Sequence, residues 1–193
     1  MTSGERDGKA TLRARLRSLR RGAVMPSMVS EAPRAVAALG VGPGRVVCAY
    51  AASAREPGSV AMLDALVGAG YRVLLPVVVG DGLAWAPYDG RLRRGAFGLS
   101  EPVGAASALP AGVALVLVPA LAVDHAGVRL GKGGGYYDRA LASCAAPKVA
   151  VVRDEEFVPV LPAEPHDVRV DAVLTPSGLV RLPLRPGPPR RPL

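Results

Sequence analysis

The stretch of this sequence with the clearest chemical potential is residues 131–139, Gly-Lys-Gly-Gly-Gly-Tyr-Tyr-Asp-Arg. Glycines let a backbone approach a ligand closely and turn its N–H groups toward it. A helix expected to begin at Tyr137 adds unpaired N–H donors and a partial positive charge. Lys132 supplies a full positive charge, and Asp138 has carboxylate oxygens that suit a magnesium ion accompanying a phosphate. Together these residues predict a binding site for a phosphate-bearing ligand, most simply a nucleotide.

The spacing of the glycines alone leaves an alternative open. The loop lacks the G-x-x-x-x-G-K-[ST] pattern of a P-loop, and no acidic residue at a strand end follows at the distance that a dinucleotide-binding fold requires. A glycine-rich run of this kind is also compatible with a merely flexible turn. The complete run of residues 129–139, RLGKGGGYYDR, is much more specific than its glycine count.

A second group of cations lies near the start of the chain, on a predicted helix over residues 9–22. Its apolar stripe consists of Leu12, Leu16 and Leu19, and beside that stripe lie Lys9, Arg13, Arg17 and Arg20 or Arg21. Like charges at these spacings repel one another slightly. The pattern is equally compatible with a solvated helix face and with an anion site.

Composition limits the partners of the chain. Its 193 residues carry a net charge of +8, half of them are apolar, and only 4% are aromatic. The charge favours anionic partners, but the scarcity of aromatic rings argues against single-stranded nucleic acid. We therefore expect no nucleic-acid partner.

Three further features point to a cytoplasmic protein. No apolar run is long enough to span a bilayer, and residues 1–23 are too polar for a signal peptide. The only cysteines, Cys48 and Cys144, lie among apolar or small residues, which predicts buried free thiols and a reducing compartment. With two histidines and no C-x-x-C pair, a zinc site is not expected.

Elements that could position these groups alternate along the chain. Further helices are predicted over residues 26–39, 60–67 and 137–144, and strands over residues 45–50, 72–79, 83–87, 113–118, 148–152 and 170–175. The alternation predicts an α/β fold with a mainly parallel sheet covered on both faces, in a single domain over residues 1–182. The Pro/Arg-rich tail over residues 183–193 is predicted to be flexible. Ligands of such sheets lie beyond the carboxyl ends of the strands, where the glycine-rich loop falls.

The sequence resembles the 5-formyltetrahydrofolate cyclo-ligases, also called 5,10-methenyltetrahydrofolate synthetases. The core of the resemblance is residues 118–124, Gly127 and residues 129–139. Outside this core, matching segments lie at residues 9–13, 56–57, 97–102, 161–167 and 170–175. The resemblance implies a three-layer fold like that of ribose-isomerase and CoA-transferase-like proteins.

The resemblance also implies a reaction and its cofactor. ATP drives the cyclisation of 5-formyltetrahydrofolate to 5,10-methenyltetrahydrofolate, through phosphorylation of the formyl oxygen and attack by N10, with Mg²⁺ bound at Asp138 and Asp167. Without the resemblance, a helix cap for Asp138 and a turn role for Asp167 are the alternatives. The partners implied are these two substrates alone, and we expect a monomer that binds no membrane.

The family pattern assigns further residues to each part of the site. Contacts to ATP fall on Lys9, Arg13, Arg129, Leu130, Gly131, Lys132, Gly133, Gly134, Gly135, Tyr136 and Tyr137. Contacts to the folate fall on Tyr50, Glu56, Lys132, Gly133, Gly134, Gly135 and Tyr136. The groups assigned to catalysis are Arg129, Lys132 and Tyr136.

Several positions depart from the family pattern or stay ambiguous. Ala120 stands where glycine is usual, Val123 where phenylalanine is common, and Glu156 where glutamine is frequent. The loss of the aromatic at Val123 is expected to change the shape of the folate pocket. Phe97, Trp85 and Tyr88 are compatible with core packing or a pocket wall, and His125 and His166 are predicted to be loop residues.

Two other functions remain compatible with the sequence. One is a related enzyme that keeps the ATP loop but acts on another formylated or amide substrate. The other is a regulatory module that binds a nucleotide or a folate without turnover, although the presence of Glu56, Asp138 and Asp167 together argues against it.

Overall fold

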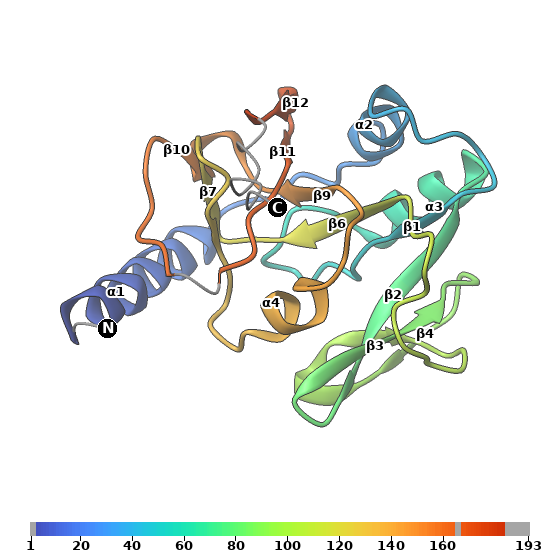
Figure 1. Ribbon diagram of the computed structural model, residues 1–193, viewed down its shortest axis with the longest axis horizontal. Coiled ribbons are helices and arrows are strands. Elements are labelled where there is room, and N and C mark those ends of the chain that lie inside the picture. Colours follow the sequence, from blue (N-terminus) through green and yellow to red (C-terminus); the bar gives the residue numbers. More distant parts are fainter. Residues whose placement is uncertain (1–2, 165–166, 184–193) are drawn as a thin grey trace, which may run out of the picture.

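The computed structural model describes residues 3–164 and 167–183, and its centre is a seven-stranded sheet (Figure 1). The strand order is β12-β11-β9-β6-β1-β2-β3. The five inner strands run parallel, whereas β12 and β3 pair antiparallel at the two edges. Their bounds are β1 (Val46–Cys48), β2 (Arg72–Val79), β3 (Gly82–Pro87), β6 (Leu115–Pro119), β9 (Lys148–Val151), β11 (Ala172–Thr175) and β12 (Gly178–Arg181).

Both faces of this sheet are covered. Successive side chains of a strand point to opposite faces, so Leu117 packs into one apolar cluster and Val118 into another. The first cluster includes residues of α2 (Glu31–Ala38) and α3 (Val60–Gly68). The second includes Leu141 of α4 (Tyr136–Leu141). The molecule therefore has the three-layer α/β arrangement with a mainly parallel sheet that the sequence predicts.

A smaller sheet lies between the large sheet and the first helix. It has the order β10-β7-β8, formed by β7 (Ala122–Asp124), β8 (Arg129–Leu130) and β10 (Phe157–Val158). Leu16 of α1 (Ser3–Arg20) packs with Leu121, Val128, Leu130 and Leu161 in a third apolar cluster. This cluster fixes α1 against the segment that carries the glycine-rich loop.

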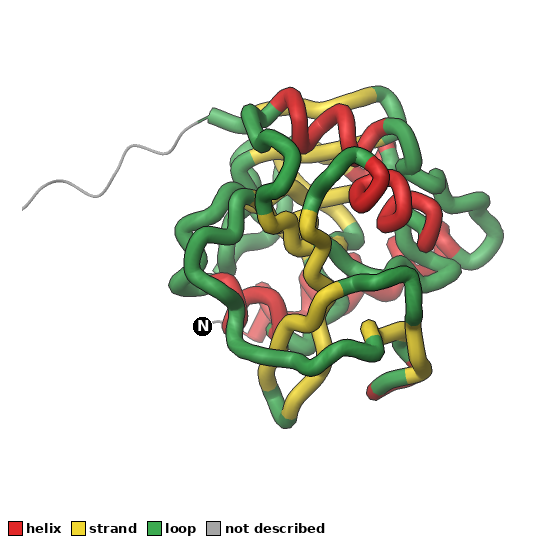
Figure 2. Tube along the Cα trace, turned by 90° about the vertical axis from the view of Figure 1, so that its right-hand side faces the viewer, coloured by secondary structure: helices red, strands yellow, loops and turns green. Residues whose placement is uncertain are grey.

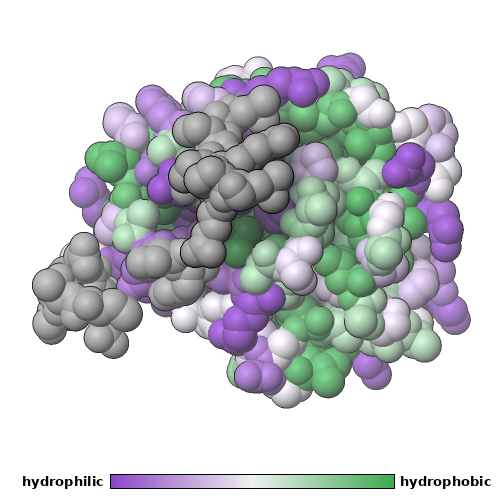
Figure 3. Space-filling model, viewed as in Figure 1, coloured by the Kyte–Doolittle hydropathy of each residue, from purple (hydrophilic) through white to green (hydrophobic). Residues whose placement is uncertain are grey.

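A short antiparallel hairpin completes the fold. Strands β4 (Leu92–Arg94) and β5 (Ser100–Pro102) are joined by a 3₁₀ turn, η1 (Ala96–Gly98). A second 3₁₀ turn, η2 (Asp154–Glu156), precedes β10. Figure 2 shows that loops make up much of the chain between these elements. In Figure 3, apolar residues cover much of the face formed by α4 and the β2–β3 ribbon.

Several expectations about the elements need correction. The first helix begins at Ser3 and ends at Arg20, and α2 spans only Glu31–Ala38, because Met28 adopts a positive φ of 58° before it. Strands β4, β5, β7, β8, β10 and β12 were not predicted, since runs of two to four residues give little periodicity. The predicted flexible tail lies, after Pro183, outside the described residues.

Several side chains also differ from their expected environment. Leu19, expected in the apolar stripe of the first helix, is 56% exposed, and the neighbouring Arg20 is buried instead. Of the two free thiols, Cys48 is buried as expected and Cys144 is only partly buried. Burial raises the pKa of Cys48 to about 12, so this thiol is unreactive at neutral pH. Among the described residues, no helix is both long and apolar enough to cross a bilayer.

Candidate active site

A cavity of about 260 Å³ lies at the carboxyl ends of the parallel strands. Tyr50 and Ala51 line it after β1, Val78 at the end of β2, and Pro119 and Ala120 at the end of β6. Residues 131–135 and α4 close one side of it, and α1 contributes Lys9 and Arg13. This is the place at which ligands of parallel α/β sheets bind.

Left-handed glycines shape the loop over residues 131–135. Gly133 has a φ of 104° and Gly135 a φ of 66°, conformations that other residues adopt only with strain. Gly135 is also the residue before α4, which has only six residues. The N–H groups of the loop itself are therefore more important for binding an anion than the dipole of this short helix.

Three guanidinium groups hold the carbonyls of this loop. Nε of Arg13 donates to the carbonyl of Gly131 at 3.0 Å, and Arg17 donates to that of Lys132 at 2.6 Å. Arg139 donates to the carbonyl of Gly134 at 3.1 Å and also to that of Asp81. The loop is therefore held in one conformation by hydrogen bonds from α1 on one side and from α4 on the other.

A salt bridge crosses the cavity between Lys132 and Glu56, with Nζ 2.8 Å from Oε1. The other carboxylate oxygen of Glu56 accepts hydrogen bonds from the N–H and hydroxyl groups of Ser53. Burial alone would raise the pKa of Glu56, but Lys132 and Ser53 more than offset this and lower it. Glu56 is therefore ionised at neutral pH although it is almost completely buried.

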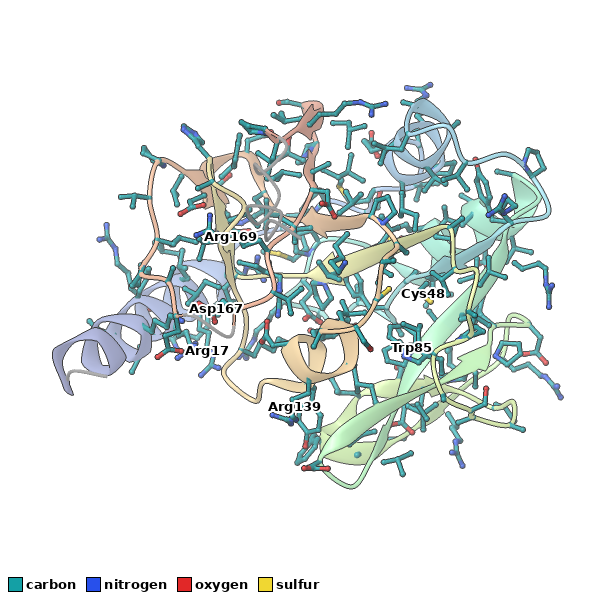
Figure 4. All side chains as sticks on the ribbon, viewed as in Figure 1. Arg17, Cys48, Trp85, Arg139, Asp167 and Arg169 are labelled. Atoms are coloured by element: carbon teal, nitrogen blue, oxygen red, sulfur yellow. The ribbon has the colours of Figure 1, made fainter. Side chains whose placement is uncertain are left out.

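At the α1 side of the cavity, Lys9 bonds two acids. Its Nζ lies 2.7 Å from Oδ2 of Asp167 and 3.0 Å from Oε2 of Glu164, and the lysine is 5% exposed. Figure 4 shows Asp167 beside α1 near Arg17. A solvated helix face is therefore the wrong interpretation for Lys9, which points into the protein.

Arg129 and Asp138 form a third ion pair at the cavity, with NH2 2.8 Å from Oδ1. The guanidinium also donates to the carbonyl of Pro119 and lies 5.7 Å from the ring centroid of Tyr137. Burial raises the pKa of Tyr137, so its phenol stays neutral. Asp138 accepts a further bond from the N–H of Val168 rather than from the first turn of α4, which excludes the helix-cap alternative.

The remaining wall of the cavity is mainly apolar and comes from β2, β3 and the β4–β5 hairpin. Phe97 lies at the tip of the hairpin with a φ of 55°, 79% exposed, and its ring centroid is 6.4 Å from that of Tyr136. Glu101 is buried in this wall and accepts the N–H of Val78 at 3.1 Å. Strand β1 pairs with β2 only as far as Leu74 and does not reach Val78. The carboxylate of Glu101 therefore accepts the hydrogen bond that a backbone carbonyl of a neighbouring strand would otherwise accept from Val78.

Comparison with known proteins identifies the family to which this chain belongs. The family model of the 5-formyltetrahydrofolate cyclo-ligase family matches residues 5–176. The chain belongs to this family. The 5-formyltetrahydrofolate cyclo-ligase of Mycolicibacterium smegmatis is 50% identical over 153 residues, which cover 72% of this chain and 78% of that protein.

One solved structure of similar fold leads to the same family, and a second shares the fold. The structure of the Aquifex aeolicus 5,10-methenyltetrahydrofolate synthetase has a TM-score of 0.70 and 27% identity, covering 95% of this chain and 99% of that one. A Mycoplasma pneumoniae 5,10-methenyltetrahydrofolate synthetase has a TM-score of 0.64, covering 86% of this chain and 96% of that one. At 19% identity, the second likeness concerns the fold alone.

Nearly all residues that the cyclo-ligase resemblance assigns line this same cavity. They are Lys9, Arg13, Tyr50, Glu56, Arg129, Gly131, Lys132, Gly133, Gly134, Gly135, Tyr136, Tyr137, Asp138 and Asp167. Leu130 does not line the cavity, because its side chain packs in the third apolar cluster. Only its backbone is then left to contact a nucleotide.

The structure also gives the environment of the residues that the sequence left ambiguous. Val123 is completely buried in the second cluster and does not itself line the cavity, so an effect of the missing aromatic on the shape of the folate pocket stays a prediction. Trp85 and Tyr88 are also core residues, and His125 lies exposed in a turn, as predicted. His166 falls outside the described residues.

Sequence reasoning did not single out Glu101, Glu164 or Arg139, although all three touch the site. Glu164 lies three residues before Asp167, and the N–H of Glu164 donates to Oδ2 of Asp167 at 2.7 Å. Asp167 therefore combines a turn role with its ion pair to Lys9. The matched segment over residues 161–167 contained the only signal for Glu164.

Proposed function

We propose that this protein catalyses the ATP-dependent cyclisation of 5-formyltetrahydrofolate to 5,10-methenyltetrahydrofolate, with release of ADP and phosphate. The observation that supports this most directly is the Lys132–Glu56 ion pair. It joins a cationic, glycine-rich loop suited to phosphates and a buried carboxylate suited to a polar heterocycle within one cavity. Membership of the cyclo-ligase family supports the same conclusion.

The chemistry of the reaction explains why the phosphate-binding loop and the folate-binding carboxylate must lie in the same cavity. Expelling a formyl oxygen as hydroxide is slow, because hydroxide is a poor leaving group. Transfer of the γ-phosphoryl group of ATP to that oxygen gives ADP and makes the carbon more electrophilic. The lone pair of N10 then forms a bond to this carbon, the C–O bond breaks as phosphate leaves, and the proton lost from N10 ends on the released phosphate. The main tasks of the protein are to position the two substrates and neutralise charge.

Lys132 is the group that we place at the meeting point of the two substrates. It extends from the loop toward the side of the cavity that holds Glu56, and half of its side chain is exposed. An ammonium group at this place would stabilise negative charge on the transferring phosphoryl group. Lys9, Arg13, Arg129 and the N–H groups of the loop surround the remaining phosphates in this proposal, with Tyr136 beside them.

Magnesium would be held by Asp138 and Asp167. Both line the cavity and present carboxylate oxygens, the ligands that this ion prefers, and water and phosphate oxygens would complete the set. The described residues contain no cluster of three or more acidic, histidine or cysteine side chains that could bind a metal without the nucleotide. When bound, the ion supplies positive charge to the phosphate oxygens.

Glu56 and Tyr50 are the side chains that we assign to the folate. Glu56 stays ionised and can accept hydrogen bonds from the donor groups of the pterin. Tyr50 donates to the carbonyl of Pro57, and burial raises its pKa well above the usual value. Tyr50 would therefore act as a neutral wall and not as a base.

A coupled assay tests the proposal. The protein is mixed with Mg²⁺, ATP and 5-formyltetrahydrofolate, and the methenyl chromophore and released phosphate are followed together. We expect one phosphate for each methenyl product. The absence of both signals would refute the proposal, and phosphate release with a different formylated or amide substrate would identify the related enzyme instead. Binding of both ligands without turnover would identify a regulatory module.

We place this activity in the cytoplasm, in keeping with the free thiols of Cys48 and Cys144, and expect a monomer that binds neither nucleic acid nor membrane. Light scattering on the purified protein, alone and with added nucleic acid or lipid vesicles, checks the expected oligomeric state and the expected lack of binding to either partner. A stable dimer or a complex with either partner would contradict them.

A further inference from the structure

Arg20, the last residue of α1, is 2% exposed and bonds three separate segments of the chain. Nε and NH2 donate to the two carboxylate oxygens of Glu156, at 2.7 and 2.5 Å. NH2 also donates to the carbonyl of Ala120 at 2.8 Å, and NH1 to that of Arg55 at 3.1 Å. One buried guanidinium group therefore links α1, the turn after β6, the loop after β1 and η2.

Two of these segments belong to the folate side of the cavity. Ala120 lines the cavity itself at the carboxyl end of β6. Arg55 directly precedes Glu56, whose carboxylate bonds Lys132. Fixing the Arg55 carbonyl thus fixes the backbone from which the Glu56 side chain extends.

The linkage requires a guanidinium in particular. A planar fork with several N–H donors reaches a carboxylate and two carbonyls at once, whereas the ammonium of lysine is a point charge without this geometry. Glu156 is completely buried and is held in turn by the N–H and Nε groups of Arg153. Its carboxylate therefore has little freedom to follow a displaced partner.

We propose that Arg20 is a positioning residue for the folate side of the site, locked in place by Glu156. It holds the Ala120 carbonyl and the loop that carries Glu56 at a fixed distance from α1. The inference rests on the proposed cyclo-ligase function and adds a specific role to a residue that touches neither substrate.

The effect should be confined to the folate. Lys9 and Arg13, the nucleotide contacts on the same helix, have their own partners in Asp167, Glu164 and the Gly131 carbonyl. Arg20 lies seven positions after Arg13, which is about 10 Å along a helix. A purely structural anchor for α1, in contrast, would disturb both ends of the site or only the stability of the fold.

The test compares Arg20→Lys and Glu156→Gln with Arg21→Lys, a matched control at the next residue, directly after the end of α1. Arg21 is exposed and bonds only Ser18 among the described residues. For each folded variant, KM for 5-formyltetrahydrofolate and kcat are measured at saturating ATP, and the dissociation constant of ATP is measured by calorimetry. Thermal unfolding is recorded separately.

For Arg20→Lys we expect kcat/KM for the folate to fall by about 10- to 100-fold, the range for a group displaced by roughly 1 Å. The dissociation constant of ATP should stay within about threefold of the wild-type value, as should all constants of Arg21→Lys. Glu156→Gln should lower kcat/KM for the folate as well. If Arg20→Lys does not fold, Glu156→Gln alone tests the proposal.

The positioning role would be overturned if the affinity for ATP fell as much as kcat/KM for the folate. It would also be overturned if thermal stability fell while kcat/KM for the folate stayed unchanged. If the wild-type protein forms no methenyl product, the proposed function fails and this inference fails with it. An active wild type with unaffected variants refutes the inference alone.

Discussion

Nζ of Lys132 and Oε1 of Glu56 lie 2.8 Å apart, although the lysine is half-exposed and the glutamate is almost completely buried. The loop over residues 131–135 is thereby connected to the loop after β1 before any substrate is present. An incoming formyl group that reaches Lys132 must compete with Glu56 for the ammonium group. The pair therefore holds Lys132 at the reacting centre and keeps Glu56 ionised.

Replacing Lys132 by alanine should lower turnover by about 10²- to 10³-fold, the usual effect of removing one group that stabilises transition-state charge. The fold should survive, because half of this side chain is exposed. Steady-state kinetics and circular dichroism check both points. Arg91→Ala, which breaks an exposed ion pair with Asp89, is the matched control and should leave turnover unchanged. Near-normal turnover of Lys132→Ala would contradict the placement of Lys132.

Replacing Glu56 by alanine should abolish saturation with 5-formyltetrahydrofolate while ATP binding is retained. The carboxylate is the buried acceptor on the folate side, whereas the nucleotide contacts come from α1 and the glycine-rich loop. Calorimetric titrations with each ligand measure the two effects separately. An ATP affinity reduced as strongly as the folate affinity would show that Glu56 acts through Lys132 alone. The neighbour Ser53→Ala, which removes one hydroxyl donor to Glu56, should have a smaller effect in the same direction.

Sequence alone predicted the parts of this fold that have strong local signals. Residues 72–79 form a strand with the predicted bounds, since eight largely apolar residues leave little alternative. The glycine-rich loop was predicted because the glycines, the lysine and the aspartate that indicate phosphate binding are adjacent in the sequence. The strands of two or three residues in the smaller sheets depend on partners distant in sequence, and no local pattern marks them.

The pairing of charges could not be predicted in the same way. Lys9 and Asp167 are 158 positions apart, and only the folded chain brings them within 2.7 Å. Arg20 and Arg21 are the same residue type in adjacent positions, yet one is buried and the other exposed. A rotation of about 100° per residue separates their directions on a helix, so a small error in helix phase exchanges their roles.

Replacing Asp138 by asparagine should lower turnover by about 10²-fold and raise the Mg²⁺ concentration needed for half-maximal activity. The amide oxygen can still accept a hydrogen bond from Arg129, so the fold should persist. Activity is measured over a magnesium titration, with Asp89→Asn as a control for the loss of an acidic group outside the cavity. A chelator should abolish wild-type turnover, and an unchanged magnesium requirement in Asp138→Asn would remove this residue from the metal site.

Replacing Gly95 by alanine should destabilise the protein by about 1–3 kcal/mol, the usual cost of overpacking. A Cβ atom at this position would overlap with the carboxyl group of Glu101, which is buried in the apolar wall of the cavity. Gly82→Ala is the control, because its Cβ would approach nothing closer than the Val79 carbonyl at 3.8 Å. Chemical denaturation compares the two, and equal stabilities would show that the β4–β5 hairpin gives way without cost.

The buried Arg20–Glu156 pair should make stability depend on pH in the acid range. Burial alone would raise the pKa of Glu156, but hydrogen bonds from Arg20 and Arg153 more than offset this and lower it below the ordinary value of 4.5. A group with a lowered pKa stabilises the folded state above its unfolded pKa, and this contribution is lost as the pH falls through the folded pKa.

Glu156→Gln should therefore lower the free energy of unfolding by about 1–3 kcal/mol at pH 7, since a buried charged hydrogen bond is lost. The difference from the wild type should shrink as the pH falls below 4.5. Denaturant unfolding at pH 7, 5.5, 4.5 and 3.5 measures it, with the adjacent, exposed Glu155→Gln as the control at each pH. A difference that stays constant across this range would mean that Glu156 is not held as a carboxylate by Arg20, and the lock on α1 would then depend on the shape of the side chains and not on their charge.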